Sequence, residues 1–479
     1  MLNTCRSPRQ KKPRRRKRLH SPLFNCFSLL RLSPLRRPLR GIAAALGSLL
    51  LCAACNVNPV SGDKEFGWLD ESWETRIGEQ HYRLQQQAGG GLYRLDPALS
   101  RYVATIGAQL AQHSQRAHLP YEFVVLNHSS ANAWALPGGK IALNRGLLLA
   151  LHDEAELAAV LAHEIVHVDA RHSAQRQEVG QLIGVAQLAT QALLANAGLD
   201  SRATQQGIAY GSLYGQTHYS RGRELQADRL GMHYMQRAGY DVSAAVQLQQ
   251  TFVSLSQEKN NDHFSALFAS HPPSPARVEA NRDTAAQLPS GGELGTKRFA
   301  EAMATLQRQQ PAYQHADQAL EALRKKDYLQ AIELADKAIA IEPKESLFYQ
   351  LKGRAQMQLN RSAEALRSLD RAVQLNDDYY APSLWRGLLH YSLQSYRAAE
   401  RDLRASLALA PSQVAHIKLA QIAERQQRCN DAAEHYRQAL ALATKKQQRA
   451  TLQQRIEALQ VSCLNAGGSS GDKTGEASI

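Results

Sequence analysis

Most apolar residues in this chain recur at the three- to four-residue spacing of amphipathic helices. Two short stretches depart from this pattern. Residues 121–126 (YEFVVL) are rich in β-branched and aromatic side chains and predict a strand, and residues 140–143 predict a second extended segment after the turn Pro137-Gly138-Gly139. The pattern therefore predicts a mostly α, α+β fold class with a small β-sheet.

The clearest predicted helix begins at Asp153, where Glu156 three residues later forms a capping box. Apolar residues between Leu157 and Val168 follow at helical spacing. A second helix is predicted for residues 221–237, just before Gly239. Between these two helices, the Ala- and Gly-rich residues 181–216 contain no uninterrupted apolar run of 18 residues, so we do not expect a transmembrane hairpin.

The C-terminal part of the chain repeats with a period of 33 or 34 residues. Small residues recur at two positions of the period, twelve residues apart: Ala319 and Ala331, Gly353 and Ala365, Gly387 and Ala399, Ala420 and Ala432. This helix–turn–helix period is the signature of tetratricopeptide (TPR) repeats, whose paired helices approach too closely for large side chains. The alternative, an irregular helical bundle, does not explain the recurring positions. Such solenoids usually bind polypeptide along a concave face.

The formal net charge of +14 belongs almost wholly to the N-terminus. Residues 1–54 contain 13 Lys and Arg and no acid, which leaves 44 basic and 43 acidic side chains in residues 55–479. The basic stretch precedes an uncharged run, residues 41–54, that has the length of a signal-peptide core. We therefore do not expect a nucleic-acid-binding protein.

Cys55 follows this run, and Cys52-Ala53-Ala54-Cys55 resembles a bacterial lipoprotein box with Cys52 in the place usually taken by Leu. We expect lipidation of Cys55, and Asn56 favours the outer membrane. The alternatives are cleavage to a soluble periplasmic form and a translation start placed too far upstream. In an oxidising compartment Cys429 and Cys463 form a candidate disulfide, with two free buried thiols as the alternative.

These boundaries divide the chain into six predicted segments. They are a basic leader and signal peptide (1–54), a lipoprotein tether (55–71), a domain that contains the small sheet (72–287), a linker (288–311), the TPR repeats (312–464) and a disordered tail (465–479).

The strongest chemical motif is His163-Glu164-Ile165-Val166-His167. On a helix, positions i and i+4 share a face, so both imidazoles can reach one metal ion, and Glu164 can contact its bound water. A catalytic zinc needs a third protein ligand. The candidate is Glu224, and Asp228 lies one turn later on the same predicted helix, where it can orient a ligating histidine.

Four segments resemble the HtpX/BepA group of gluzincin metallopeptidases. They are NAWALPGG at residues 132–139 (with Trp in place of the family's Phe), HEIVHVDARHS at 163–173, SRGRELQADRLG at 220–231 and SHPPSPARVEAN at 270–281. The resemblance covers roughly residues 65–460 and, with the C-terminal repeats, looks most like the periplasmic type with TPRs. An integral-membrane protease of this group is disfavoured because the membrane spans are missing.

The resemblance implies one Zn²⁺ per chain bound by His163, His167 and Glu224, with Glu164 as the general base. It also implies that His271 lies near the metal, where it can occupy the open coordination position and restrain the enzyme. His172 and Arg277 match positions that support the site, and residues 140–143 would form the edge strand along which an extended substrate pairs.

Together these features predict a zinc-dependent endopeptidase of the bacterial periplasm and outer membrane. Its substrates would be misfolded or assembling envelope proteins, its TPR repeats would recruit substrates or partners, and the outer-membrane β-barrel assembly machinery is a candidate partner. The alternative is a TPR-based periplasmic chaperone or binding module with a self-inhibited or regulatory metallopeptidase domain.

Overall fold

The computed structural model describes residues 55–60, 62, 64–66, 69–176, 220–258 and 262–468. The predicted leader, residues 181–216 and most of the predicted tail lie outside these residues. Two short strands, β1 (Cys55–Val57) and β2 (Lys64–Phe66), form a two-stranded sheet in the segment predicted as a tether. Within the described part of the chain, no helix has both the length and the apolar character needed to cross a membrane.

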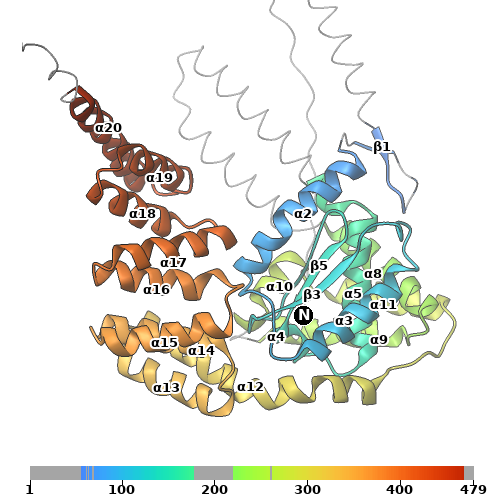
Figure 1. The fold of residues 1–479 in the computed structure, drawn as a ribbon. Coiled ribbons are helices and arrows are strands. Elements are labelled where there is room, and N and C mark those ends of the chain that lie inside the picture. The colour runs from blue at the N-terminus through green and yellow to red at the C-terminus, as the bar shows by residue number, and fades with distance from the viewer. Residues whose placement is uncertain are drawn as a thin grey trace, which may run out of the picture. The chain divides into compact units, whose positions relative to one another are not determined.

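The first half of the described chain is a helical layer around a three-stranded sheet (Figure 1). Its strands are β3 (Glu122–Leu126), β4 (Ala133–Leu136) and β5 (Lys140–Asn144). Its helices are α2 (Glu71–Ala88), α3 (Pro97–Ala111), α4 (Arg145–Leu148), α5 (Glu154–Asp169), α8 (Arg221–Arg237), α9 (Ser243–Ser256), a 3₁₀ turn η1 (Asp262–Phe264), α10 (Ser265–Ser270) and α11 (Pro275–Gln287). This confirms the predicted mostly α, α+β class.

The strand order β3-β5-β4 corrects one prediction. Residues 140–143, predicted as the edge strand, form the centre of the sheet, because β5 pairs in parallel with β3 and antiparallel with β4. All five residues of β5 are buried. The outer strand on this side is β4, which the alternation of side chains did not reveal because it has only four residues. The two outer strands of this sheet are therefore β3 and β4.

The helix α5 is buried almost throughout and crosses the centre of this half. Asp153 caps it by accepting a hydrogen bond from the backbone of Glu156 at 2.8 Å, as predicted. The Glu156 carboxylate reaches one residue further back than a capping box requires and accepts from the backbone of His152 at 2.7 Å. The partner helix α8 packs against α5 and has the predicted bounds, with Ser220 as its cap.

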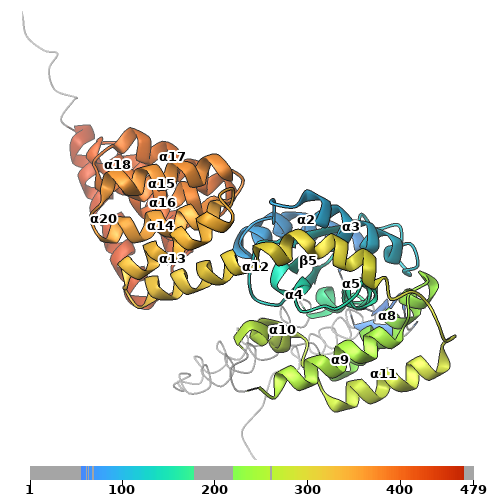
Figure 2. The same cartoon turned by 90° about the horizontal axis from the view of Figure 1, so that it is seen from below.

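The second half is a stack of antiparallel helix pairs (Figures 1 and 2). The helices are α12 (Thr296–Arg324), α13 (Tyr328–Ile341), α14 (Ser346–Gln358), α15 (Ser362–Leu375), α16 (Tyr380–Ser392), α17 (Tyr396–Leu409), α18 (Gln413–Arg425), α19 (Cys429–Ala441) and α20 (Lys446–Gly468). A Cβ on Gly353 would lie 2.7 Å from the Leu369 side chain, and a Cβ on Gly387 would lie 2.9 Å from Leu403. This close approach is the physical reason for the repeated small residues.

The turn inside each repeat also recurs. The middle of the three residues between the helices has a positive φ of 58–64° in all four pairs, at Lys326, Asn360, Gln394 and Gln427. A non-glycine residue in this conformation is uncommon, and its recurrence at one position shows that the four turns share one geometry. The second half is therefore an array of TPR repeats.

The predicted linker, residues 288–311, is only partly irregular. The helix α12 begins at Thr296 and continues through Pro311 into the first repeat. Phe299, Met303 and Leu306 lie on one buried face of it and belong to the same hydrophobic core as the sheet. The Gly- and Pro-rich composition suggested a linker, but this i, i+4, i+7 spacing is helical and outweighed it. At the other end, α20 extends to Gly468 and so includes the first residues of the predicted tail.

Polar contacts also join the first half to the repeats. The buried Arg145 guanidinium donates to Asn127 Oδ1 at 2.8 Å and to Ser129 Oγ at 2.7 Å, and its Cζ lies 3.3 Å from the centre of the Tyr313 ring. Glu345 accepts from Tyr313 at 2.7 Å and from Asn127 at 3.1 Å. Burial lowers the pKa of Arg145 and raises the pKa of Glu345. The nearby charges and hydrogen bonds therefore do not fully offset the cost of burying either charged side chain.

Candidate metal centre

Packing of α5 against α8 brings the predicted ligands together. His163 Nε2 and His167 Nε2 lie 3.0 Å apart on one face of α5. From α8, the Glu224 oxygens lie 3.6 Å from His163 Nε2 and 3.4 Å from His167 Nε2. His271, which directly follows α10, places Nδ1 3.2 Å from His163 Nε2 and 3.3 Å from Glu224 Oε1. One ligand atom of each residue lies within 4.8 Å of those of the other three.

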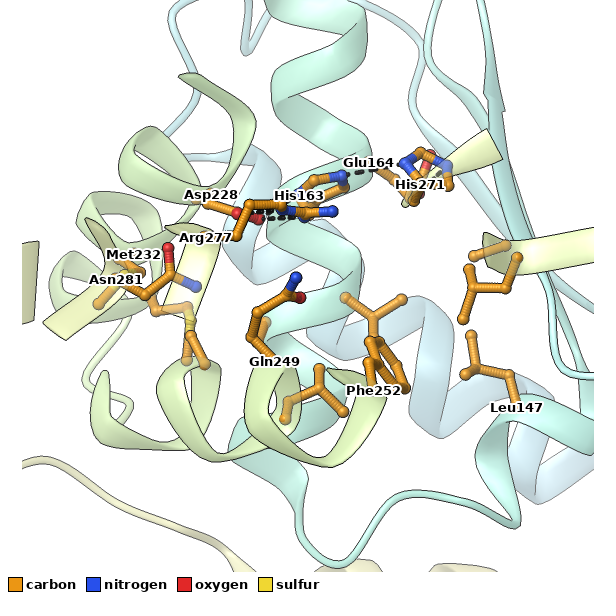
Figure 3. A pocket seen from close by; sticks show the side chains of 18 residues that line it. Leu147, His163, Glu164, Asp228, Met232, Gln249, Phe252, His271, Arg277 and Asn281 are labelled. Atoms are coloured by element: carbon orange, nitrogen blue, oxygen red, sulfur yellow. Dashed lines mark hydrogen bonds and ion pairs between the residues drawn. The ribbon is translucent and has the colours of Figure 1, made fainter. Parts of the chain in front are cut away.

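Charged groups behind the cluster fix the orientation of His163. Its Nδ1 lies 2.9 Å from Asp228 Oδ1. An acidic partner on Nδ1 favours a proton there and leaves the lone pair of Nε2 directed at the centre. Asp228 is held in turn by two hydrogen bonds of 2.7 Å from Arg277, whose third nitrogen lies 2.9 Å from Glu224. Figure 3 shows the side chains of His163, Asp228 and Arg277 next to one another, joined by dashed lines that mark these contacts.

His167 has a different supporting contact. Its Nδ1 lies 2.8 Å from Nδ1 of His172, whose Nε2 lies 2.9 Å from Gln226 Oε1. Asp228, His172 and Arg277 therefore all contact a predicted ligand. Gln226 was missed, because a glutamine two residues after Glu224 has no spacing that marks it in the sequence.

The electrostatics of the cluster suit a bound cation. Burial alone would lower the pKa of His163, but contacts with Asp228 and Glu224 raise it to about 10. Burial lowers the pKa of His167 well below its usual value. Burial would raise the pKa of Glu224, but the charge of His271 and contacts with His163 and His167 hold it well below its usual range. Glu224 is therefore anionic and His167 neutral, which are the forms that ligate metals, whereas His163 carries a proton that a bound metal would displace.

Glu164 provides the strongest sign of an additional group. Its side chain is 2% exposed, and Oε2 is buried with no hydrogen-bond partner among the described residues. Oε1 lies 3.5 Å from His271 Nε2. An unpartnered buried carboxylate oxygen is costly. A metal-bound water or substrate group beside this oxygen would remove the cost, so the residues present fit a metal centre.

A small cavity of about 60 Å³ adjoins the cluster (Figure 3). His163, Glu164 and His271 form one wall, and Ala133 of the edge strand β4 also lines the cavity. The remaining walls are largely apolar and include Leu147, Val160, Met232 and Phe252. Gln249 Nε2 is buried there without a hydrogen-bond partner in the described part of the chain. The sequence did not single out Gln249, because it lies in an ordinary amphipathic helix.

A buried aspartate at the end of α5 was also missed. Asp169 accepts hydrogen bonds from Tyr234 at 2.7 Å, from Tyr121 at 2.8 Å and from the backbone of Gln115 at 3.0 Å. These contacts attach the end of the helix that carries both histidines to α8 and to the residues before β3. Asp169 therefore positions α5, although it does not face the cluster.

Residues 97–285 match Peptidase family M48. The chain contains a peptidase family M48 domain. Members of this family depend on a metal, and the cluster of His163, His167 and Glu224 in this M48 domain can hold one.

Curated relatives of the M48-containing chain are similar over different lengths. A putative beta-barrel assembly-enhancing protease of Vibrio cholerae is 34% identical over 201 residues, which are 40% of this chain and 40% of the relative. The beta-barrel assembly-enhancing protease of Escherichia coli K12 is 26% identical over 371 residues, 71% of this chain and 74% of the relative. The chain thus spans less than half the length of the Vibrio relative.

Among solved structures, MamA from Desulfovibrio magneticus aligns with 32% of this chain and 96% of its own length. The sequence identity is 17% and the TM-score is 0.27. A TM-score this low carries no functional information.

Proposed function

We propose that this chain is a zinc-dependent endopeptidase that hydrolyses peptide bonds in misfolded or assembling proteins of the bacterial envelope. The convergence of His163, His167 and Glu224 beside the unpartnered carboxylate of Glu164 carries the proposal. The names of the relatives, beta-barrel assembly-enhancing proteases, support envelope proteins as the substrate class.

In the proposed mechanism His163, His167 and Glu224 hold Zn²⁺. Zinc in such a site polarises a carbonyl and lowers the pKa of a bound water to about 7. Glu164 accepts a proton from the attacking water and delivers it to the leaving amine. Asp228 and Arg277 keep Nε2 of His163 directed at the centre, and His172 holds the ring of His167.

We place the substrate along β4 rather than along residues 140–143. In the antiparallel pairing with β5, the backbone of Asn144 donates to Asn132 at 2.9 Å, so the backbone groups of Ala133 and Ala135 point to the open edge. The Ala135 carbonyl accepts from Ser173 at 3.3 Å. An extended peptide pairing with Ala133 would pass the wall that His163 and Glu164 form and place an apolar side chain in the adjoining cavity.

His271 would act as a removable plug in this site. It lies within contact distance of His163, Glu164 and Glu224, so it occupies the space a substrate carbonyl needs. We expect His271→Ala to raise casein hydrolysis about tenfold or more while the metal content stays the same. Hydrolysis would be measured as release of fluorescent peptide from labelled casein, and metal by elemental analysis.

His81→Ala is the matched control, because His81 is exposed on α2 and its loss should leave hydrolysis at the wild-type rate. If neither the wild type nor His271→Ala cuts casein at full metal loading, the second candidate function applies. In that case the TPR array acts as a periplasmic chaperone or binding module, and the metallopeptidase domain is regulatory. The position of His271 in the cluster is the observation that favours this second candidate.

We further propose that Cys55 is lipidated and that the chain faces the periplasm from the outer membrane, recruiting partners through its TPR array. Cys429 begins α19 and Cys463 lies in α20, but the Cys463 side chain lies outside those described, so their pairing stays a prediction. Intact-mass measurement of the mature protein should show a lipid on Cys55 and a mass two hydrogens lower for the disulfide. An unmodified mature protein that begins elsewhere would contradict the anchor.

A further inference from the structure

A second, larger cavity of about 600 Å³ lies away from the metal centre. The loop after β3 and the η1 turn contribute Ser129 and His263 to its wall, and the first two TPR repeats contribute Arg324, Gln350 and Arg354. The proposed catalytic residues do not line it. Its volume is sufficient for several residues of an extended polypeptide.

Two guanidinium groups face this cavity from neighbouring repeats. Arg324 ends α12 and is largely exposed, and Arg354 lies near the end of α14. Burial and the nearby charge of Arg324 lower the pKa of Arg354, so the two groups repel each other. The Arg354 guanidinium is fixed 4.5 Å above the centre of the Trp385 ring. Among the described residues, no carboxylate lies within ion-pair distance of Arg354.

The carboxylates that line the cavity do not neutralise this pair of arginines. Asp317 accepts from Ser129 at 2.8 Å, and Glu345 accepts from Tyr313 and Asn127. Both lie close enough to Arg145 to act on its charge. The third, Asp262, lies on the η1 side of the cavity. On α12, Glu321 lies 3.5 Å from Arg324, but both side chains are exposed, so this pair offsets the charge only weakly. Arg354 on α14 has no such partner among the described residues, so this side of the cavity keeps an uncompensated positive charge.

A buried acceptor lies next to the arginines. Gln350 is 4% exposed and lines the cavity one helical turn before Arg354, on the same face of α14. Its Oε1 has no hydrogen-bond partner within the described ranges. A backbone N–H of a bound peptide would satisfy this oxygen, which a simple inorganic anion without protons cannot do.

We propose that Arg324, Gln350 and Arg354 form a binding site for a carboxylate of an extended polypeptide. The two guanidinium groups bind the carboxylate, and the Gln350 carbonyl accepts from the adjacent backbone N–H. The carboxylate comes either from the C-terminus of the polypeptide or from an Asp or Glu side chain. The site does not include the metal centre, so a failure of this proposal would not count against the proposed peptidase activity, and a failure of the peptidase activity would not count against this site.

The test measures peptide binding by fluorescence anisotropy with the full-length chain carrying Glu164→Gln, so that no peptide is cut. Three labelled decapeptides of Gly, Ser and Ala are compared: one with a free C-terminus, one amidated, and one amidated with a single internal Glu. We expect the free or the Glu-containing peptide to bind at least about tenfold more tightly than the amidated one. Which of these two binds identifies the source of the carboxylate.

Arg354→Gln and, on the exposed end of α12, Arg324→Glu should each weaken this binding about tenfold or more. Arg367→Gln removes an exposed arginine of α15 outside the cavity and should leave it unchanged. Circular dichroism confirms that each variant is folded, and Arg324→Glu keeps the test valid if Arg354→Gln is not. Equal binding of all three peptides, binding unaffected by both variants, or no binding of either carboxylate peptide would overturn the proposal.

Discussion

Replacing Glu164 with Gln should reduce peptide hydrolysis by a factor of about 10² to 10⁴ while the metal stays bound. The amide has the shape of the carboxylate but cannot accept a proton, and the proposed ligands His163, His167 and Glu224 are unchanged. Hydrolysis of labelled casein and metal per chain should be measured on the same preparation. The comparison is best repeated with His271→Ala present in both proteins, because the plug would otherwise keep the reference rate low.

Glu79→Gln provides the matched control, since Glu79 is exposed on α2 and lies far from the cluster in the sequence. It should retain full activity and full metal content. Two results would count against the role of Glu164. One is a hydrolysis rate close to that of the parent protein, and the other is loss of activity that simply follows loss of metal.

Arg145→Ala should lower the free energy of unfolding by about 3 kcal/mol, because it empties a buried volume and removes donors from buried acceptors. Arg145 is 2% exposed, and its guanidinium contacts Asn127, Ser129 and the ring of Tyr313. These residues belong to the loop after β3 and to the first repeat. We therefore also expect the repeats and the M48 domain to unfold in separate steps in the variant.

Urea denaturation followed by tryptophan fluorescence and by circular dichroism would detect both effects. Arg101→Ala, which removes an exposed arginine from α3, should shift the midpoint by much less. If Arg145→Ala behaves like Arg101→Ala, the buried guanidinium does not hold the two halves together.

Features encoded by neighbouring residues were predictable from the sequence. The end of α8 followed from Gly239 two residues later, and the shared face of His163 and His167 followed from helix geometry. The period of the repeats predicted the TPR array, because each helix pair needs small residues at the same two positions.

Features that depend on distant partners were not predictable. The order of strands places β4 at the edge, and a single sequence contains no pattern that distinguishes an edge strand of four residues from a central one. Glu345 lies 218 positions from its partner Asn127. Gln226 and Asp169 likewise support the site through contacts that no spacing rule describes. The predicted linker extended too far, because residues 299–306 have a helical apolar spacing and belong to α12, which begins at Thr296.

The helix α12 has a consequence for any attempt to divide this protein. Its 29 residues form one rod about 44 Å long, with Phe299 and Met303 at one end in the core of the M48 domain and Ala316 and Ala319 at the other inside the repeats. A fragment that ends just before Ala312 would stop in the middle of α12. A fragment of repeats that begins at Ala312 would lack the half of α12 that packs into the core of the M48 domain. Rotation of the first repeat about this axis would therefore also turn the face of α12 that packs into the core of the M48 domain.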